Sequence, residues 1–121
     1  MKSRILSSST ITGQNVYNLK DENIGDIKDL MIDPNNAEVV YAVLSFGGFL
    51  GIGSKYFAIP VEALQFNEKD ETIRLDVNKE KLENAPSFDK DNWPMTADNE
   101  FVGSVYSHYG YERPEHRRTT A

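Results

Sequence analysis

Short apolar runs separated by turn residues are the feature that most restricts the fold of this chain. They occupy residues 16–19, 25–33, 39–46, 56–60, 61–66 and 71–77. The runs are rich in β-branched and aromatic residues, as strands are, and turn signals recur about every eight to twelve residues. In the last run, Ile73, Leu75 and Val77 alternate with polar residues, so that one face would be buried. The pattern predicts a mainly β fold, a small closed or nearly closed barrel of five or six strands.

Three of these strands carry further information. Residues 39–46 are long and apolar enough to predict the central strand. In residues 25–33 the apolar positions are interrupted by acids, which favours a bulge or twist near Asp29. Pro60 cannot donate to a strand ladder, so it marks a strand end or edge. The segments rich in Asp, Asn and Pro predict turns at residues 20–23, 33–36 and 67–70.

The last third of the chain predicts helices instead of strands. Asn78 can cap a helix over residues 79–84, and Asp98 can cap another over 99–109 that Gly110 would end. The second helix carries an apolar stripe made of Phe101, Val102, Val105, Tyr106 and Tyr109. Such a stripe must be buried against something.

We therefore expect two parts, a barrel domain at residues 9–78 and a C-terminal extension at 79–121 with one or two short helices and a loose tail. The linker between the two helices holds Trp93, directly before Pro94. A single tryptophan in a linker usually anchors it to a core.

Composition excludes several classes of function. The chain has 39% hydrophobic and 26% charged residues, which is typical of a globular protein, and no apolar run approaches the length of a membrane span. It has no cysteine, so disulfides, thiolate nucleophiles and thiolate metal sites are excluded. The net charge of −6 argues against DNA and makes RNA an improbable partner, although Arg113, Arg117 and Arg118 make the tail locally basic. We expect a cytoplasmic location, because no signal-peptide core follows the basic start.

A loop with four glycines, residues 47–53, separates two predicted strands and carries Phe49, Leu50 and Ile52. Large apolar side chains in a loop either fold back over a core or offer a contact surface. The glycines do not match a nucleotide site, because Ser54 and Lys55 stand in reversed order for a P-loop.

No residue pattern argues for catalysis or for a metal. Asp26 would point away from Asp29 and Asp33 on a regular strand, and His108 and His116 lack the spacing of a zinc pair. Ser45 is not in a nucleophile-elbow motif. Glu62 is the acid with the most apolar neighbours, where burial could raise the pKa. We expect no catalytic residue, no cofactor and no metal.

Several segments together resemble the PRC-barrel family. The likeness covers about residues 9–78, and its most specific part is the run from Val40 to Gly53 followed by the Ile59-Pro60 strand end. Residues 82–89, 92–94 and 105–110 are similar to the extension of free-standing bacterial members. The same barrel occurs in the cytoplasmic part of the photosynthetic reaction-centre H chain and in a ribosome-maturation factor. The resemblance implies a PRC-type β-barrel that docks onto proteins or RNA–protein assemblies, often as a dimer, and it carries over no catalytic residue.

The leading expectation is a non-catalytic adapter that forms a homodimer or higher homo-oligomer and docks on a protein partner. One alternative is a small-molecule or hydrolytic site at the barrel mouth near Glu62, and another is an assembly factor for an electron-transport or photosynthetic complex. An enzyme should show a polar pocket with a perturbed acid, whereas an adapter should show an exposed apolar patch. The predicted interaction residues are Phe49, Leu50, Ile52, Trp93, Phe101, Val105 and Tyr109.

Overall fold

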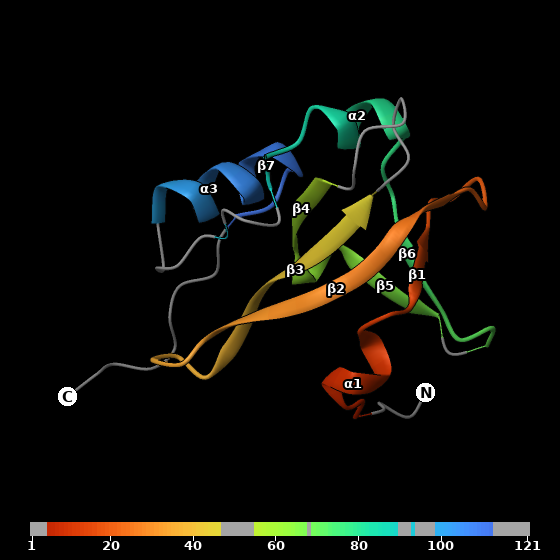
Figure 1. Ribbon diagram of the computed structural model, residues 1–121, viewed down its shortest axis with the longest axis horizontal. Helices are drawn as coiled ribbons and strands as arrows, with labels where there is room; N and C mark the ends of the chain where they lie inside the picture. The colour runs from red at the N-terminus through yellow and green to blue at the C-terminus, as the bar shows by residue number, and fades with distance from the viewer. Residues whose placement is uncertain (1–4, 47–54, 68, 90–92, 94–98, 113–121) are drawn as a thin grey trace.

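The computed structural model describes residues 5–46, 55–67, 69–89, 93 and 99–112 (Figure 1). In chain order the elements are α1 (Ser8–Ile11), β1 (Asn15–Tyr17), β2 (Asn23–Asp33), β3 (Glu38–Phe46), β4 (Lys55–Pro60), the 3-10 helix η2 (Val61–Ala63), β5 (Leu64–Asn67), β6 (Thr72–Leu75), α2 (Lys79–Glu83), β7 (Ser87–Phe88) and α3 (Asn99–His108). None of the described helices is long and apolar enough to cross a membrane.

The described strands form one mixed sheet in the order β5-β6-β1-β2-β3-β4-β7. β1 and β6 are parallel, and every other neighbouring pair is antiparallel. The predicted mainly β class with a short helical extension is confirmed. The sheet has seven strands and is not closed, because its end strands β5 and β7 do not pair with each other in the described part of the chain. β2 holds the middle position of the sheet, and the predicted central strand β3 lies next to it.

The seventh strand comes from the extension. Ser87 and Phe88 pair with Phe57 and Tyr56 of β4. The sequence predicted a helix break here and no strand, because two residues are too few to show an alternating pattern.

A second difference concerns residues 61–66, which were predicted as one strand. Val61 to Ala63 form the 3-10 turn η2, and only then does β5 begin at Leu64. Pro60 explains the break, because it has no N–H for a ladder and its fixed φ favours a turn start. The predicted strand at 71–77 is also shorter, since the N–H of Val77 bonds back to the carbonyl of Leu75.

The predicted bulge in β2 is confirmed, because the register against β3 shifts between Ile27 and Asp29 and again between Met31 and Ile32. The predicted turn after β1 is held by Asn18, a buried side chain whose Oδ1 accepts from the N–H groups of Lys20 and Glu22. This arrangement lets Asp21 adopt a left-handed φ of 62°.

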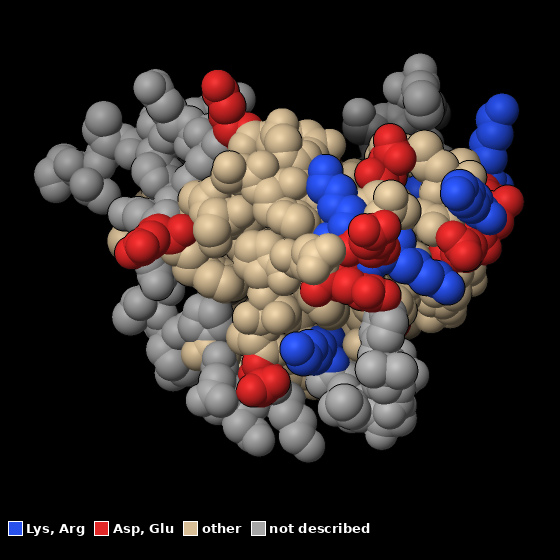
Figure 2. Space-filling view, turned by 90° about the horizontal axis from the view of Figure 1, so that it is seen from above, with Lys and Arg blue, Asp and Glu red and all other residues tan. Residues whose placement is uncertain are grey.

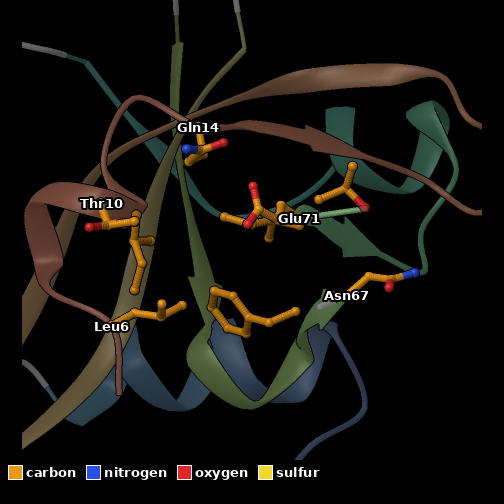
Figure 3. A pocket seen from close by; sticks show the side chains of 9 residues that line it. Leu6, Thr10, Gln14, Asn67 and Glu71 are labelled. Atoms are coloured by element: carbon orange, nitrogen blue, oxygen red, sulfur yellow. The ribbon is translucent and has the colours of Figure 1, made fainter. Parts of the chain in front are cut away.

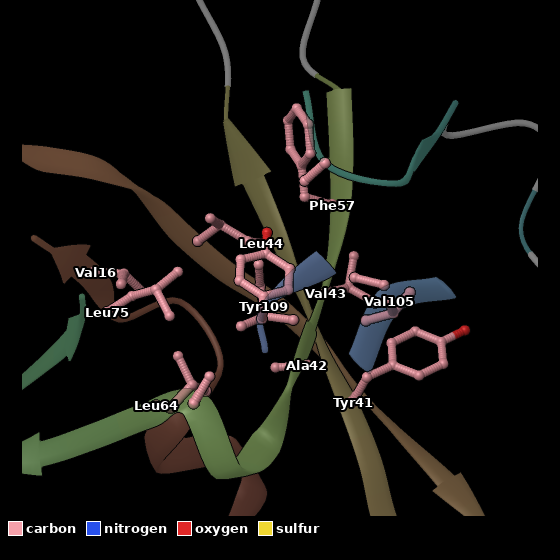
Figure 4. Close-up of a cluster of buried hydrophobic side chains, with 14 of the residues drawn as sticks. Val16, Tyr41, Ala42, Val43, Leu44, Phe57, Leu64, Leu75, Val105 and Tyr109 are labelled. Carbon is pink, nitrogen blue, oxygen red and sulfur yellow. The ribbon is translucent and has the colours of Figure 1, made fainter. Parts of the chain in front are cut away.

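One hydrophobic core joins strands β1 to β6 with helices α2 and α3 (Figure 4). Its largest fully buried side chains include Ile24, Ile27, Leu44, Ile59 and Leu75. Leu82 of α2 and Val105 of α3 are both fully buried, so the extension completes the core of the barrel.

Both predicted helices of the extension are confirmed, and α1 was not predicted. The side chain of Asn78 accepts from the N–H of Lys81, as expected of an N-cap. Gly110 follows α3 with a φ of +79°, where glycine is favoured. α1 is a single helical turn that Ser7 caps. Its four residues show no apolar periodicity from which it could be predicted.

Candidate interaction surface

Aromatic side chains from β4, β7, α3 and the linker form a cluster on one side of the sheet. Trp93 stands edge-on to Tyr56 and Phe88, with ring centroids 5.3 and 5.2 Å apart. Phe88 also contacts Tyr56 and Phe101, and Phe101 contacts Tyr41 of β3 at 6.0 Å. The predicted anchoring of the linker by Trp93 is thus observed, and Phe88 brings Trp93 and Phe101 together.

This aromatic cluster is only partly covered. Tyr56, Phe88, Trp93 and Phe101 are each half-buried, whereas Tyr41 is buried. Seen from above, charged side chains gather at the end of the molecule that carries α2, and the middle of the view is largely uncharged (Figure 2). Partly buried aromatic side chains that contact one another are typical of the central part of a protein interface.

The rest of the predicted stripe is packed inside the chain's own core. Val105 is fully buried and Tyr109 is 8% exposed, and both lie among core side chains (Figure 4). The apolar periodicity therefore located the face of α3 that covers the sheet. Phe49, Leu50 and Ile52 lie outside the described residues, so their role in contacts stays a prediction.

The end of the β2–β3 hairpin forms a second apolar surface, which the sequence reasoning did not single out. β1 pairs with β2 only from Asn23 to Asp26, and the pairing of β4 with β3 ends at Tyr41. Beyond these points the hairpin reaches past the other strands (Figure 1). We call this two-stranded part, residues 29–33 and 38–40, the ribbon.

The apolar side chains of the ribbon are unevenly covered, because Leu30, Met31 and Val40 pack against the core whereas Ile32 does not. Ile32 is 63% exposed and lies opposite Val39, and Leu30, Met31 and Val40 are only half-buried. A two-stranded ribbon is at best marginally stable in water by itself. The signal that could have found it was the length of the two predicted strands, which exceeds that of their neighbours.

Glu62 is held by the extension. The hydroxyl of Tyr106 lies 2.8 Å from a Glu62 carboxylate oxygen and also 2.8 Å from the carbonyl oxygen of Val40. Glu62 itself is exposed on η2 and does not line the pocket that the structure shows between α1 and the β5–β6 hairpin (Figure 3). This pocket is therefore not the barrel-mouth site that was expected near Glu62.

The acids and histidines weighed in the sequence are dispersed in the structure. Asp33 is buried and accepts from the N–H of Asn35 and the side-chain amide of Asn36, so it stabilises its own turn. His108 contacts the carbonyl oxygen of Lys81 at 3.0 Å, and His116 lies outside the described residues. Among the residues described, no three His, Cys, Asp or Glu side chains are grouped so that they could hold a metal.

The comparison with known families agrees with this architecture. The PRC-barrel domain matches residues 4–82, which is more than half of the chain. The protein belongs to the PRC-barrel family. No curated protein matches the chain. Family membership confirms the resemblance drawn from the sequence and indicates a small β-barrel module for protein interaction.

Proposed function

We propose that this protein is a non-catalytic PRC-barrel adapter that associates with itself and docks on a protein partner. The observation that carries the proposal is the ribbon, where Ile32 is 63% exposed opposite Val39 in strands that extend past their neighbours. Burying such side chains stabilises association by about 25 cal/mol per Å2 of apolar area before the costs of ordering are counted. The half-exposed aromatic cluster around Trp93 supplies a second surface for a partner.

The proposal that the protein is not an enzyme is supported by the partners that its potentially reactive side chains already have. Glu62 is bonded to Tyr106, and His108 is bonded to the main chain at Lys81. Ser45 lies within the β3 ladder, opposite Asp26 and Tyr56. In the part of the molecule described, these three side chains do not form the hydrogen-bonded chain of nucleophile, base and acid that a hydrolase of this kind needs.

Self-association is tested by the solution mass of the full chain, measured by light scattering. We expect a dimer or higher oligomer, and we expect Ile32→Lys to shift it to the monomer, because a charge would be buried in the contact. Leu19→Lys is the matched control, since Leu19 is 56% exposed in the turn after β1, away from the ribbon.

A monomeric wild-type chain would refute self-association. An Ile32→Lys variant that remains as associated as the wild type would remove the ribbon from the contact. The glycine loop would then be the next surface to test, with Phe49→Ser and Leu50→Ser combined.

A further inference from the structure

A pocket of about 430 Å3 lies between α1 and the β5–β6 hairpin (Figure 3). Its volume falls within the range of about 300–1,000 Å3 that small-molecule sites occupy. It is separate from the ribbon and from the aromatic cluster, since none of its lining residues belongs to either.

The walls of the pocket are mainly apolar. Leu6 and Ile11 contribute from the α1 side, and Phe66 and Ile73 contribute from β5 and β6. Phe66 is 42% exposed, so part of its ring is open to a ligand in the pocket. These walls suit an apolar body about the size of one aromatic ring.

Most polar side chains at the pocket are already engaged. The hydroxyl of Thr10 lies 2.7 Å from that of Ser7, and the hydroxyl of Thr72 donates to Asp70. The side-chain oxygen of Asn67 accepts from the N–H of Lys69. These three side chains hold their own turns, although the side-chain NH2 group of Asn67 is not used in its bond to Lys69.

Glu71 is different. Its side chain has no hydrogen-bond or ion-pair partner among the described residues, and it lies in the centre of the close-up, below Gln14 (Figure 3). Glu71 is exposed, so its carboxylate is open to solvent and free to accept from a ligand. A carboxylate only accepts hydrogen bonds, and a cationic donor forms the stronger bond with it.

The charges around the pocket also favour a positively charged ligand. No lysine or arginine lines the pocket in the described part of the chain. Arg74 follows the lining residue Ile73 on β6, and it is held by Asp21 at 2.6 Å and by Asp70 at 3.5 Å. A phosphate or carboxylate would therefore lie near the Glu71 carboxylate, with no lysine or arginine among the described lining residues to compensate its charge.

We propose that this pocket binds a small organic amine, with its apolar body against Phe66, Ile11 and Ile73 and its ammonium group paired with Glu71. The site goes beyond the adapter function, and neither depends on the other. A ligand bound here would link α1 to the β5–β6 hairpin.

The test is a titration of the 15N-labelled full chain with 2-phenylethylamine, followed by NMR, with 3-phenylpropionate as a probe of similar body and opposite charge. We expect saturable shifts at the amides of Gln14, Glu71 and Ile73 with the amine, and none that saturate with the acid. Glu71→Gln should weaken binding of the amine by about tenfold, because the amide oxygen can still accept the hydrogen bond but the attraction between carboxylate and ammonium is lost. Glu83→Gln, an exposed acid on α2 outside the pocket, is the matched control and should leave binding unchanged.

Three results would overturn the proposal. They are equal binding of amine and acid, binding of the amine that Glu71→Gln leaves unaltered, and no saturable shift at the pocket. Glu71 forms no hydrogen bond or ion pair with the described residues, so we expect Glu71→Gln to keep the wild-type fold, and the unliganded spectrum checks that the variant is folded. The solution mass is measured on the same samples, so that a failure of self-association is distinguished from a failure of this site.

Discussion

The hydroxyl of Tyr106 on α3 lies 2.8 Å from the main-chain carbonyl oxygen of Val40 on β3. Val40 is the first residue of β3 beyond its pairing with β4, because the last pair between those strands is Tyr41 with Pro60. The same hydroxyl reaches Glu62 on η2. One side chain of the extension thus joins the base of the ribbon to the turn that precedes β5.

Replacing this hydroxyl should loosen the extension without removing its packing. Tyr106→Phe keeps the buried ring and leaves the partly buried Val40 carbonyl without its donor, so we expect the free energy of unfolding to fall by about 1–2 kcal/mol. Denaturant unfolding followed by circular dichroism measures the change. Tyr111→Phe is the control, since Tyr111 is 41% exposed after α3. An equal effect of the two substitutions would show that the bonds of the Tyr106 hydroxyl to Val40 and Glu62 contribute nothing.

The two glycines Gly103 and Gly25 should respond in opposite directions to alanine. A Cβ added at Gly103, within α3, would meet no atom within 4 Å, so Gly103→Ala should raise the free energy of unfolding by about 0.5–1 kcal/mol through helix propensity. A Cβ at Gly25 would collide with the carbonyl oxygen of Ser45, and its φ of +131° is unfavourable for alanine. We expect Gly25→Ala to cost about 2 kcal/mol or more. Thermal unfolding of both variants tests the pair, and a destabilised Gly103→Ala would contradict the open surface of α3.

Val105 was predicted as an interaction residue, and its substitution tests whether it belongs to the core of this chain instead. It is fully buried in this chain, so Val105→Ala should lower the free energy of unfolding by about 2 kcal/mol through lost burial and a cavity. Phe101 on the same helix is only half-buried and meets Tyr41 and Phe88. If Val105→Ala kept its full stability in the monomer, the packing of α3 on the sheet would be wrong.

The periodicity of apolar residues was enough to predict most of this fold. Ile73, Leu75 and Val77 are buried as their alternation required, and Asn78 caps α2 as its residue type suggested. β7 and α1 were missed for a common reason, since β7 has two residues and α1 has four, too few for a period of 2 or 3.6 residues to repeat. The sheet edge that β7 joins is decided by tertiary contacts such as that between Phe88 and Tyr56.

The candidate surfaces were harder to predict because exposure is a property of the assembled sheet. Ile32 and Ile27 belong to the same apolar run, yet Ile32 is 63% exposed and Ile27 is 1% exposed, since only Ile27 lies where other elements cover β2. Similarly, Glu71 and Gln14 line one pocket only because β1 and β6, which follow them in the chain, pair in parallel. Neither relationship is encoded in local sequence.

Tyr109 gives a prediction for the pH dependence of stability. Its hydroxyl is buried without a hydrogen-bond partner among the described residues, and burial raises the pKa of this hydroxyl well above its usual value near 10. The folded state therefore resists ionisation more than the unfolded chain does. Stability is fully present below about pH 10 and is lost as the pH rises from there toward the folded pKa, by at most about 1.4 kcal/mol per pH unit for one proton.

Tyr109→Phe should remove this contribution. At neutral pH we expect its free energy of unfolding to equal or exceed that of the wild type, because no hydrogen bond to the described residues is lost and a polar group leaves the core. Above about pH 10 its stability should fall less steeply than that of the wild type. Some slope should remain, since burial also raises the pKa of Tyr41. Denaturant unfolding at pH values from 7 to about 11 measures both effects, with Tyr111→Phe as the exposed control. A Tyr109→Phe variant with the wild-type slope and a clear loss of stability at pH 7 would mean that the hydroxyl has a bonding partner in the folded protein.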